Sequence, residues 1–183
     1  MRLFIAVDIS DEARGAAAAH ISELRHGYPR VKASWVRPEN LHITVKFLGE
    51  TPEDKIDAIK QTLTAGAAAI RPFEIELSEP GSFGKRVLFI STADETGGLN
   101  AVHASVETAL DPLGFERENR AFRPHITIAR IRDPQGTTEL IKAHNAAHLP
   151  HIRMTATGLT LYKSTLGPGG SNYQPLARIP FDL

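Results

Sequence analysis

Two short segments of the chain carry the same pair of side chains with acid-base potential. The sequence HITV begins at His42 and HITI begins at His125, so the histidines precede Thr44 and Thr127 by two residues. Residues i and i+2 of a β-strand project from one face, about 6.5 to 7 Å apart. Each segment would therefore present an imidazole and a hydroxyl together. The copies lie about half the chain apart and each follows a proline-containing connector, which indicates an internal duplication.

Two histidines and two threonines converging on one cleft would suit a phosphoryl group. A neutral imidazole can take a proton from attacking water while an imidazolium protonates the departing oxygen, because the ordinary histidine pKa near 6.5 allows both forms near neutrality. The hydroxyls of Thr44 and Thr127 can donate hydrogen bonds to the non-bridging oxygens. This chemistry needs neither a metal nor a cofactor, and we expect none.

Residues 117–132 hold five arginines and a single glutamate. Guanidinium groups bind phosphate in a bidentate manner, so this segment could hold phosphates, although a solvated basic surface is the simpler alternative. Strand alternation puts Arg123 on the face of His125 and Arg130 on the opposite face. A strand end or β-bulge would be needed to turn Arg130 inward.

A second group of histidines lies near the C-terminus. His144 and His148 are four residues apart, with His151 close behind, a spacing that could ligate a metal on a helix. No carboxylate shares the spacing, so we expect ordinary surface residues.

Hydrophobic periodicity predicts alternating strands and helices. The expected strands cover 3–7, 41–47, 73–77, 87–90, 125–131, 152–156 and 159–161, and the expected helices cover 10–27, 51–70, 99–114 and 134–147. Ser10 is the predicted first helix cap, and Thr51 with Pro52 is predicted to open the second helix. A glycine-rich turn is expected at 167–170. In the strand 41–47, Phe47 alternates with Lys46, which predicts a core position for Phe47 and places Lys46 on the face of His42.

These elements predict an α+β fold, a single bilobal domain over residues 1–183. We expect two lobes related by a pseudo-two-fold axis, each with a mainly antiparallel sheet flanked by helices, and the active-site cleft between them.

Composition narrows the classes of function. Hydrophobic residues make up 42% and charged residues 23%, as in soluble globular proteins. The absence of cysteine excludes disulfides, thiolate nucleophiles and cysteine-containing metal sites. Lys plus Arg and Asp plus Glu both number 21, so wholesale attraction to nucleic acid is not indicated. The apolar opening segment is too short for a secretory signal or a membrane span, and we expect a cytoplasmic protein without membrane contact.

The segments WVRPENLHITVKFLGE and FRPHITIARI resemble the two signatures of the two-histidine (2H) phosphoesterase superfamily. Within it the chain is similar to the RNA 2',3'-cyclic phosphodiesterases, first described as 2'-5' RNA ligases. The resemblance covers nearly the whole chain. It includes a tail in which Tyr162 and Ser164 precede a second tyrosine, Tyr173, and Leu176.

The resemblance implies hydrolysis of a 2',3'-cyclic phosphate at an RNA or nucleotide end to a 2'-phosphate, and a reverse 2'-5' ligation. It implies that His42 is the acid that protonates the 3'-oxygen and that His125 is the base that activates water. It further implies phosphate binding by Thr44 and Thr127, and a role for Arg130, which lies five residues after the second histidine.

Other substrate contacts and the oligomeric state rest on simpler arguments. Arg123 is the alternative to Arg130 as a phosphate ligand. Bases at RNA ends commonly stack on aromatic side chains, for which Tyr162 and Phe83 are the candidates. A cleft complete within one chain favours a monomer.

Two alternatives remain open. One is a protein that binds or seals RNA ends, with the histidines holding a phosphate and hydrolysis incidental. The other is a metal hydrolase with His42, His125 and either Asp8 or Glu50 as ligands.

Overall fold

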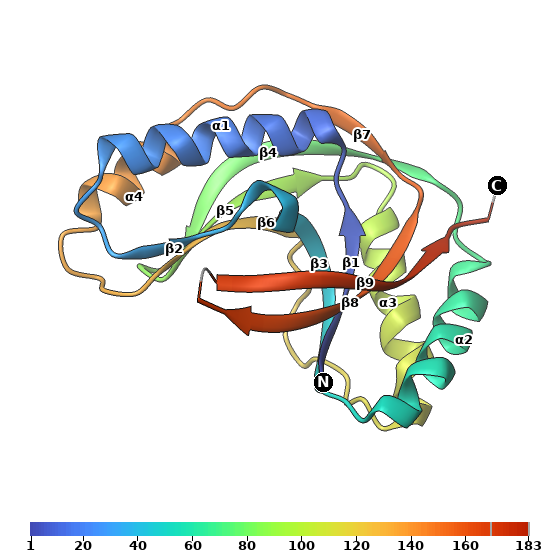
Figure 1. The fold of residues 1–183 in the computed structure, drawn as a ribbon. Coiled ribbons are helices and arrows are strands. Elements are labelled where there is room, and N and C mark those ends of the chain that lie inside the picture. Colours follow the sequence, from blue (N-terminus) through green and yellow to red (C-terminus); the bar gives the residue numbers. More distant parts are fainter. Residues whose placement is uncertain (169, 183) are drawn as a thin grey trace.

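The strands form one curved antiparallel sheet in the computed structural model, which describes residues 1–168 and 170–182 (Figure 1). The sheet has nine strands. Their bounds are β1 Arg2–Asp8, β2 Ala33–Trp35, β3 His42–Glu50, β4 Phe73–Phe83, β5 Val87–Ala93, β6 His125–Ile131, β7 Arg153–Ala156, β8 Gly158–Gly167 and β9 Gly170–Pro180. The expected α+β class is confirmed.

The sheet order is symmetric about its centre. It runs β7-β4-β5-β6-β3-β1-β8-β9, with β2 paired to β6. Along this eight-strand path, four strands lie on each side of the junction between β6 and β3, the two strands that begin with the histidine motifs. The lobes share one sheet, so the motif strands are direct neighbours instead of facing each other from separate sheets.

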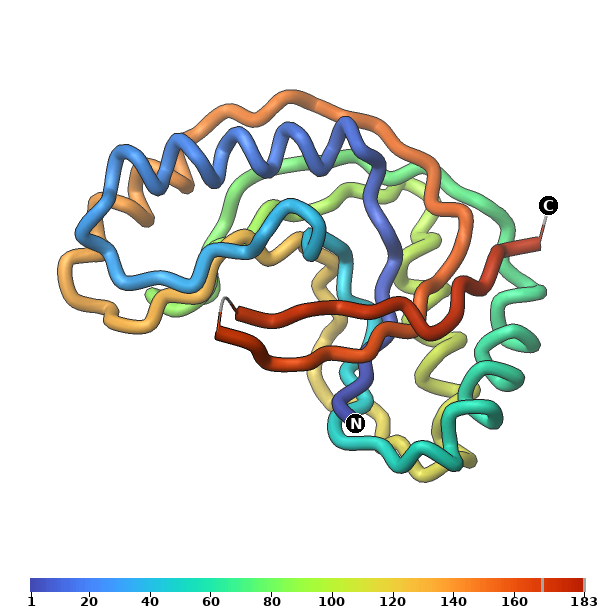
Figure 2. Tube along the Cα trace, in the orientation of Figure 1, coloured from blue at the N-terminus to red at the C-terminus, as the bar shows by residue number. Residues whose placement is uncertain are grey.

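Within the described residues, four α-helices cover this sheet in two pairs. They are α1 Asp11–Gly27, α2 Ile56–Ala67, α3 Gly98–Leu110 and α4 Thr138–Asn145, with 3₁₀ turns at Pro38–Asn40, Glu53–Lys55 and Asp111–Leu113. Helix α1 contacts α4, and α2 contacts α3. Figure 2 shows α4 and the end of α1 on one side of the molecule, with α2 and α3 on the other. Each helix buries one apolar stripe, such as Ala13, Ala17, Ile21 and Leu24 in α1. The stripes and the inner face of the sheet make the core.

The first predicted helix cap is confirmed and the second is wrong. Ser10 Oγ accepts a hydrogen bond of 3.2 Å from the backbone N–H of Ala13. Thr51 instead continues the pairing of β3 with β1, because its N–H donates to Met1 O at 2.8 Å, and its hydroxyl donates to Gly49 O at 3.3 Å. A 3₁₀ turn follows, and α2 begins only at Ile56.

The prediction for His144 is also wrong, whereas His148 and His151 are exposed as expected. His144 is fully buried and its Nδ1 lies 2.8 Å from Nε2 of buried His20. This contact joins α4 to α1, and His144 Nε2 faces the carbonyls of Gly81 and Phe89. Helix α4 buries this face because it packs on β4, a contact that helical spacing alone could not reveal.

Two further predictions concern the chain's surface and its tail. None of the described helices is both long and apolar enough to cross a membrane. The predicted glycine-rich turn connects β8 with β9, but its third residue, Gly169, lies outside the described residues.

Candidate active site

A single backbone pairing fixes the relation of the two motifs. Strand β3 pairs with β6 through Ile43 and Ile126, and both isoleucines are fully buried. Paired residues of antiparallel strands project from the same face, and their chain neighbours project from the other. The motif side chains flanking these isoleucines therefore share the opposite face, on adjacent strands.

Both histidine rings are anchored in the same way. Nδ1 of His42 lies 2.7 Å from the carbonyl oxygen of Asn40, and Nδ1 of His125 lies 2.7 Å from that of Arg123. A carbonyl oxygen only accepts, so each Nδ1 carries the hydrogen and donates it two residues back. In the neutral ring, Nε2 is then free of hydrogen and can accept a proton.

The two threonines have different neighbours. Thr44 Oγ1 lies 2.9 Å from His42 Nε2, so its hydroxyl donates to the neutral ring. Thr127 lines a cavity together with Thr44 and His125. Through Thr44 this cavity reaches the imidazole of His42.

The cavity has a volume of about 410 Å³ and combines aromatic and cationic side chains. Its lining consists of Thr44, Val45, Phe47, Phe83, Glu118, Arg120, Ala121, Phe122, Arg123, His125, Thr127 and Arg130. Such a site can take an anion against the arginines and a flat apolar group against the rings.

A β-bulge turns Arg130 into this cavity. The β5–β6 register places Leu88 opposite Ala129 but Phe89 opposite Thr127, which leaves Ile128 as the extra residue. Because the bulge reverses the alternation, Arg130 joins the face of His125, and the structure thus contains the bulge that an inward-facing Arg130 requires.

The first motif strand also contains a β-bulge, and this bulge makes the prediction for Phe47 wrong. In the β1–β3 register, Ile5 is opposite Lys46 and Ala6 is opposite Thr44, so Val45 is the extra residue. Phe47 therefore turns into the cavity and is 54% exposed, while Lys46 turns into the core and is 2% exposed. Phe47 lies five residues after His42, as Arg130 does after His125, so the internal repeat carried the signal that strict alternation missed.

The arginines of residues 117–132 differ in whether they have a side-chain partner. Arg117 binds Asp111, Arg120 binds Glu118, and Arg132 donates to Ser34 Oγ. Among the described residues, no carboxylate forms an ion pair with Arg123 or Arg130. Arg123 and Arg130 line the cavity without such an ion pair, so both are available to bind an anion.

The ring of His42 is crowded by aromatic side chains. Its centroid lies 4.9 Å from that of Phe4 and 5.4 Å from that of Tyr173. Burial lowers the pKa of His42 to about 4. The hydrogen bond to Asn40 and the Asp8 carboxylate raise this pKa, and the charges of Arg14 and His125 lower it. Asp8 lies opposite His42 in the β1–β3 register.

The ring of His125 has both aromatic and cationic neighbours. Burial lowers its pKa, and the charges of Arg130 and Arg120 lower it further. Phe83 meets this ring edge to face at 5.1 Å between centroids. Phe83 also lines the cavity, so this aromatic candidate lies beside the second motif.

Tyr162 is not among the residues that line the cavity. Its ring stacks on Phe4 at 5.2 Å, and its hydroxyl donates to Asp8 Oδ1 at 2.6 Å. Burial and this hydrogen bond raise the pKa of the Tyr162 phenol. Phe122, which sequence reasoning did not single out, takes a place in the lining.

The described residues contain no group of three or more His, Asp or Glu side chains arranged to hold a metal. Asp8 accepts hydrogen bonds from the hydroxyls of Thr160 and Tyr162. Glu50 lies within ion-pair distance of the N-terminus and Arg2. Both proposed carboxylate ligands therefore already have partners.

Comparison with known proteins agrees with this geometry. A sequence model of the 2'-5' RNA ligase superfamily matches residues 13–168. The chain belongs to this superfamily. A relative from Archaeoglobus fulgidus named RNA 2',3'-cyclic phosphodiesterase is 34% identical over 96% of this chain and 98% of its own length.

Solved structures of superfamily members share the fold. Escherichia coli LigT in its apo form superposes with a TM-score of 0.78 at 27% identity, covering 100% of this chain and 98% of LigT. LigT complexed with 3'-AMP gives a TM-score of 0.74 at 29% identity, covering 98% of this chain and 97% of that one.

Proposed function

We propose that this superfamily member hydrolyses 2',3'-cyclic phosphates at RNA or nucleotide ends to 2'-phosphomonoesters without a metal. The observation that carries this proposal is the placement of both histidine-threonine pairs on one face of adjacent strands, with each Nδ1 held by a carbonyl. The two Nε2 atoms are then the groups left to exchange protons with a substrate.

The proposed step divides acid and base between the rings. His125 Nε2 takes a proton from water as the water oxygen attacks phosphorus. The bond from phosphorus to the 3'-oxygen breaks, and His42 Nε2 gives its proton to that oxygen. Thr44, Thr127 and Arg130 donate hydrogen bonds to the non-bridging oxygens, where negative charge increases in the transition state. The product retains the phosphate on the 2'-oxygen.

Local charges act differently on the two rings. The Asp8 carboxylate raises the pKa of His42 while Arg14 and His125 lower it, whereas Arg130 and Arg120 both lower the pKa of His125. The carboxylate beside His42 favours this ring as the acid. Burial lowers the pKa of His42 to about 4. The negative charge of a bound cyclic phosphate would raise this pKa, because opposite charge favours the protonated ring.

The reverse reaction uses the same groups. A 5'-hydroxyl in place of water would attack the cyclic phosphate and form a 2'-5' phosphodiester, with the same proton transfers. The named activity of the relatives and the 3'-AMP bound to LigT support RNA ends or small nucleotides as substrates. We propose one domain over residues 1–183 that acts as a monomer, since both motifs belong to one chain. We also propose a cytoplasmic location.

Product analysis tests the proposal directly. A dinucleotide with a 2',3'-cyclic phosphate end is incubated with the protein in excess chelator, and the products are separated by chromatography. We expect a 2'-phosphate end. A 3'-phosphate product, or loss of turnover in chelator, would contradict the proposal. Tight, steeply salt-dependent binding to long RNA without turnover would instead favour an RNA-end-binding protein.

A further inference from the structure

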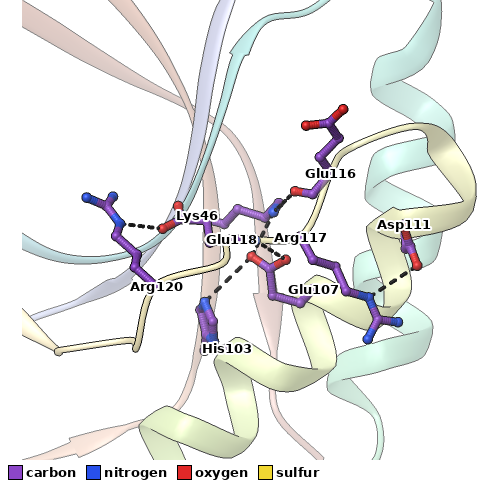
Figure 3. Close-up of polar contacts among 8 residues, drawn as sticks. All are labelled: Lys46, His103, Glu107, Asp111, Glu116, Arg117, Glu118 and Arg120. Carbon is purple, nitrogen blue, oxygen red and sulfur yellow. Dashed lines mark hydrogen bonds and ion pairs between the residues drawn. The ribbon is translucent and has the colours of Figure 1, made fainter.

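A buried ion pair joins the first motif strand to helix α3. Lys46 is 2% exposed and Glu107 is 6% exposed, and Lys46 Nζ lies 2.7 Å from Glu107 Oε1 (Figure 3). The bulge at Val45 is what sends Lys46 to this side of the sheet. Isolated buried ion pairs add little net stability, because desolvation offsets their attraction. Net stabilisation therefore does not explain this ion pair, and its other contacts indicate what it does.

The ion pair holds the loop that follows α3, which we call the 115–124 loop. Lys46 Nζ also donates to the carbonyl of Glu116 at 2.7 Å. The second carboxylate oxygen of Glu107 accepts the backbone N–H of Glu118 at 3.2 Å. Figure 3 shows the loop passing over this pair. Both charges thus bind loop backbone as well as each other.

A third contact attaches the far part of the loop to the same cluster. His103, one turn before Glu107 on α3, has its Nε2 3.5 Å from Glu107 Oε1. Its ring stacks on Phe122, with centroids 4.3 Å apart and planes 5° apart. The 115–124 loop is therefore fixed near its start and near its end.

This loop reaches the reacting groups at its C-terminal end. Arg120, Phe122 and Arg123 line the cavity, and the carbonyl of Arg123 is the acceptor that holds Nδ1 of His125. A shift of the loop would move the acceptor that sets the tautomer of His125. The carbonyl of Asn40, which holds His42, lies in a different segment.

We propose that Lys46 and Glu107 are positioning residues that hold the 115–124 loop so that the carbonyl of Arg123 anchors His125 and the side chains of Arg120 and Arg123 line the cavity. The expected effect of these residues on turnover rests on the proposed function. It couples the two halves of the site, because a side chain of the first motif strand positions the base carried by the second.

The kinetic test separates positioning from stability with a double variant. Lys46→Met with Glu107→Leu replaces the pair by apolar side chains, which leaves no uncompensated charge. We expect a melting temperature within about 5 °C of wild type and a fall in kcat/KM of about tenfold to a hundredfold, since small displacements of catalytic groups have effects of this size. Glu107→Gln, which keeps the side-chain size, is the second variant should the double variant not fold. Lys142→Met, which breaks the exposed pair with Glu139, is the control and should match wild type.

A spectroscopic test does not depend on turnover. Two-bond ¹H–¹⁵N spectra report which ring nitrogen carries the hydrogen. In the double variant or in Glu107→Gln, His125 should show a mixture of tautomers while His42 keeps its hydrogen on Nδ1. An unchanged His125 tautomer with wild-type kinetics would overturn the inference. A changed tautomer in a protein whose wild type has no turnover would uphold the inference and refute the proposed function.

Discussion

The strand around His42 and the strand around His125 repeat their local geometry but not their surroundings. Both rings donate Nδ1–H to the carbonyl two residues back, and both strands have a bulge three residues after the histidine. Both rings have aromatic neighbours, but His42 lies near the Asp8 carboxylate and Arg14, whereas His125 lies near Arg120 and Arg130 and lines the cavity. The repeated motif supplies two imidazoles that are held alike, and their different charged neighbours can divide the roles of acid and base.

Removing either ring should have the largest effect. In His42→Ala and His125→Ala, we expect kcat for a 2',3'-cyclic dinucleotide to fall about 10²- to 10⁴-fold, because proton transfer to and from the phosphate is lost. Thermal melting serves as the control for folding. Near-normal turnover in either variant would show that the two strands do not share one reaction.

Arg130 and Phe47 lie five residues after the two histidines, and substituting each should show which one binds the phosphate and which one contacts the base. Arg130→Met removes a charged donor, so we expect kcat/KM to fall about tenfold to a hundredfold. Arg132→Met is the matched control, since Arg132 is exposed and donates to Ser34. Equal losses in both variants would indicate a general charge effect.

The equivalent position in the first motif should matter less. Phe47→Ala removes an exposed ring from the cavity, and we expect about a fivefold rise in KM for a dinucleotide, as for loss of one base stack. A cyclic phosphate that lacks a base should show almost no change. Leu166→Ala, at an exposed position in β8, is the control and should behave as wild type with both substrates.

The smallest expected effect is a change in the pKa of His42 when the neighbouring carboxylate is removed. By NMR, His42 should titrate with a pKa of about 4 and His125 with a pKa below 6.5. Asp8→Asn removes the carboxylate that favours protonated His42, so the pKa of His42 should fall further while that of His125 stays unchanged. A rise in the pKa of His42 in this variant would contradict the assigned charge effect.

These pKa directions also predict how stability depends on pH. Both histidines bind protons less readily when folded than the unfolded chain does, so stability should decrease as pH falls from about 6.5 toward 4. Denaturant unfolding at several pH values measures this slope, which should be shallower in His42→Gln. An equal slope in that variant would contradict the prediction.

Much of the fold followed from sequence pattern because its signals are local. Alternation in HITV and HITI, the Ser10 cap and the stripe of α3 all depend on residues close in the chain. The failures involve partners distant in sequence. Phe47 and Lys46 exchange faces because β1 pairs with β3 across a bulge, and Thr51 binds Met1 instead of capping a helix. His144 is buried because α4 packs on β4, and it contacts His20 of α1. The carbonyls that hold the two histidine rings could not be predicted either, because every residue has a backbone carbonyl and the side-chain pattern does not show which one accepts the hydrogen bond.

The division of acid and base between the two rings can be tested with one substrate change. Replacing the 3'-oxygen of the cyclic phosphate by sulfur gives a leaving group that needs no protonation. With this substrate, His42→Ala should return to within about tenfold of wild type while His125→Ala stays impaired at least about a hundredfold. Rescue of His125→Ala instead, or of both variants equally, would contradict the assignment of His42 as acid and His125 as base.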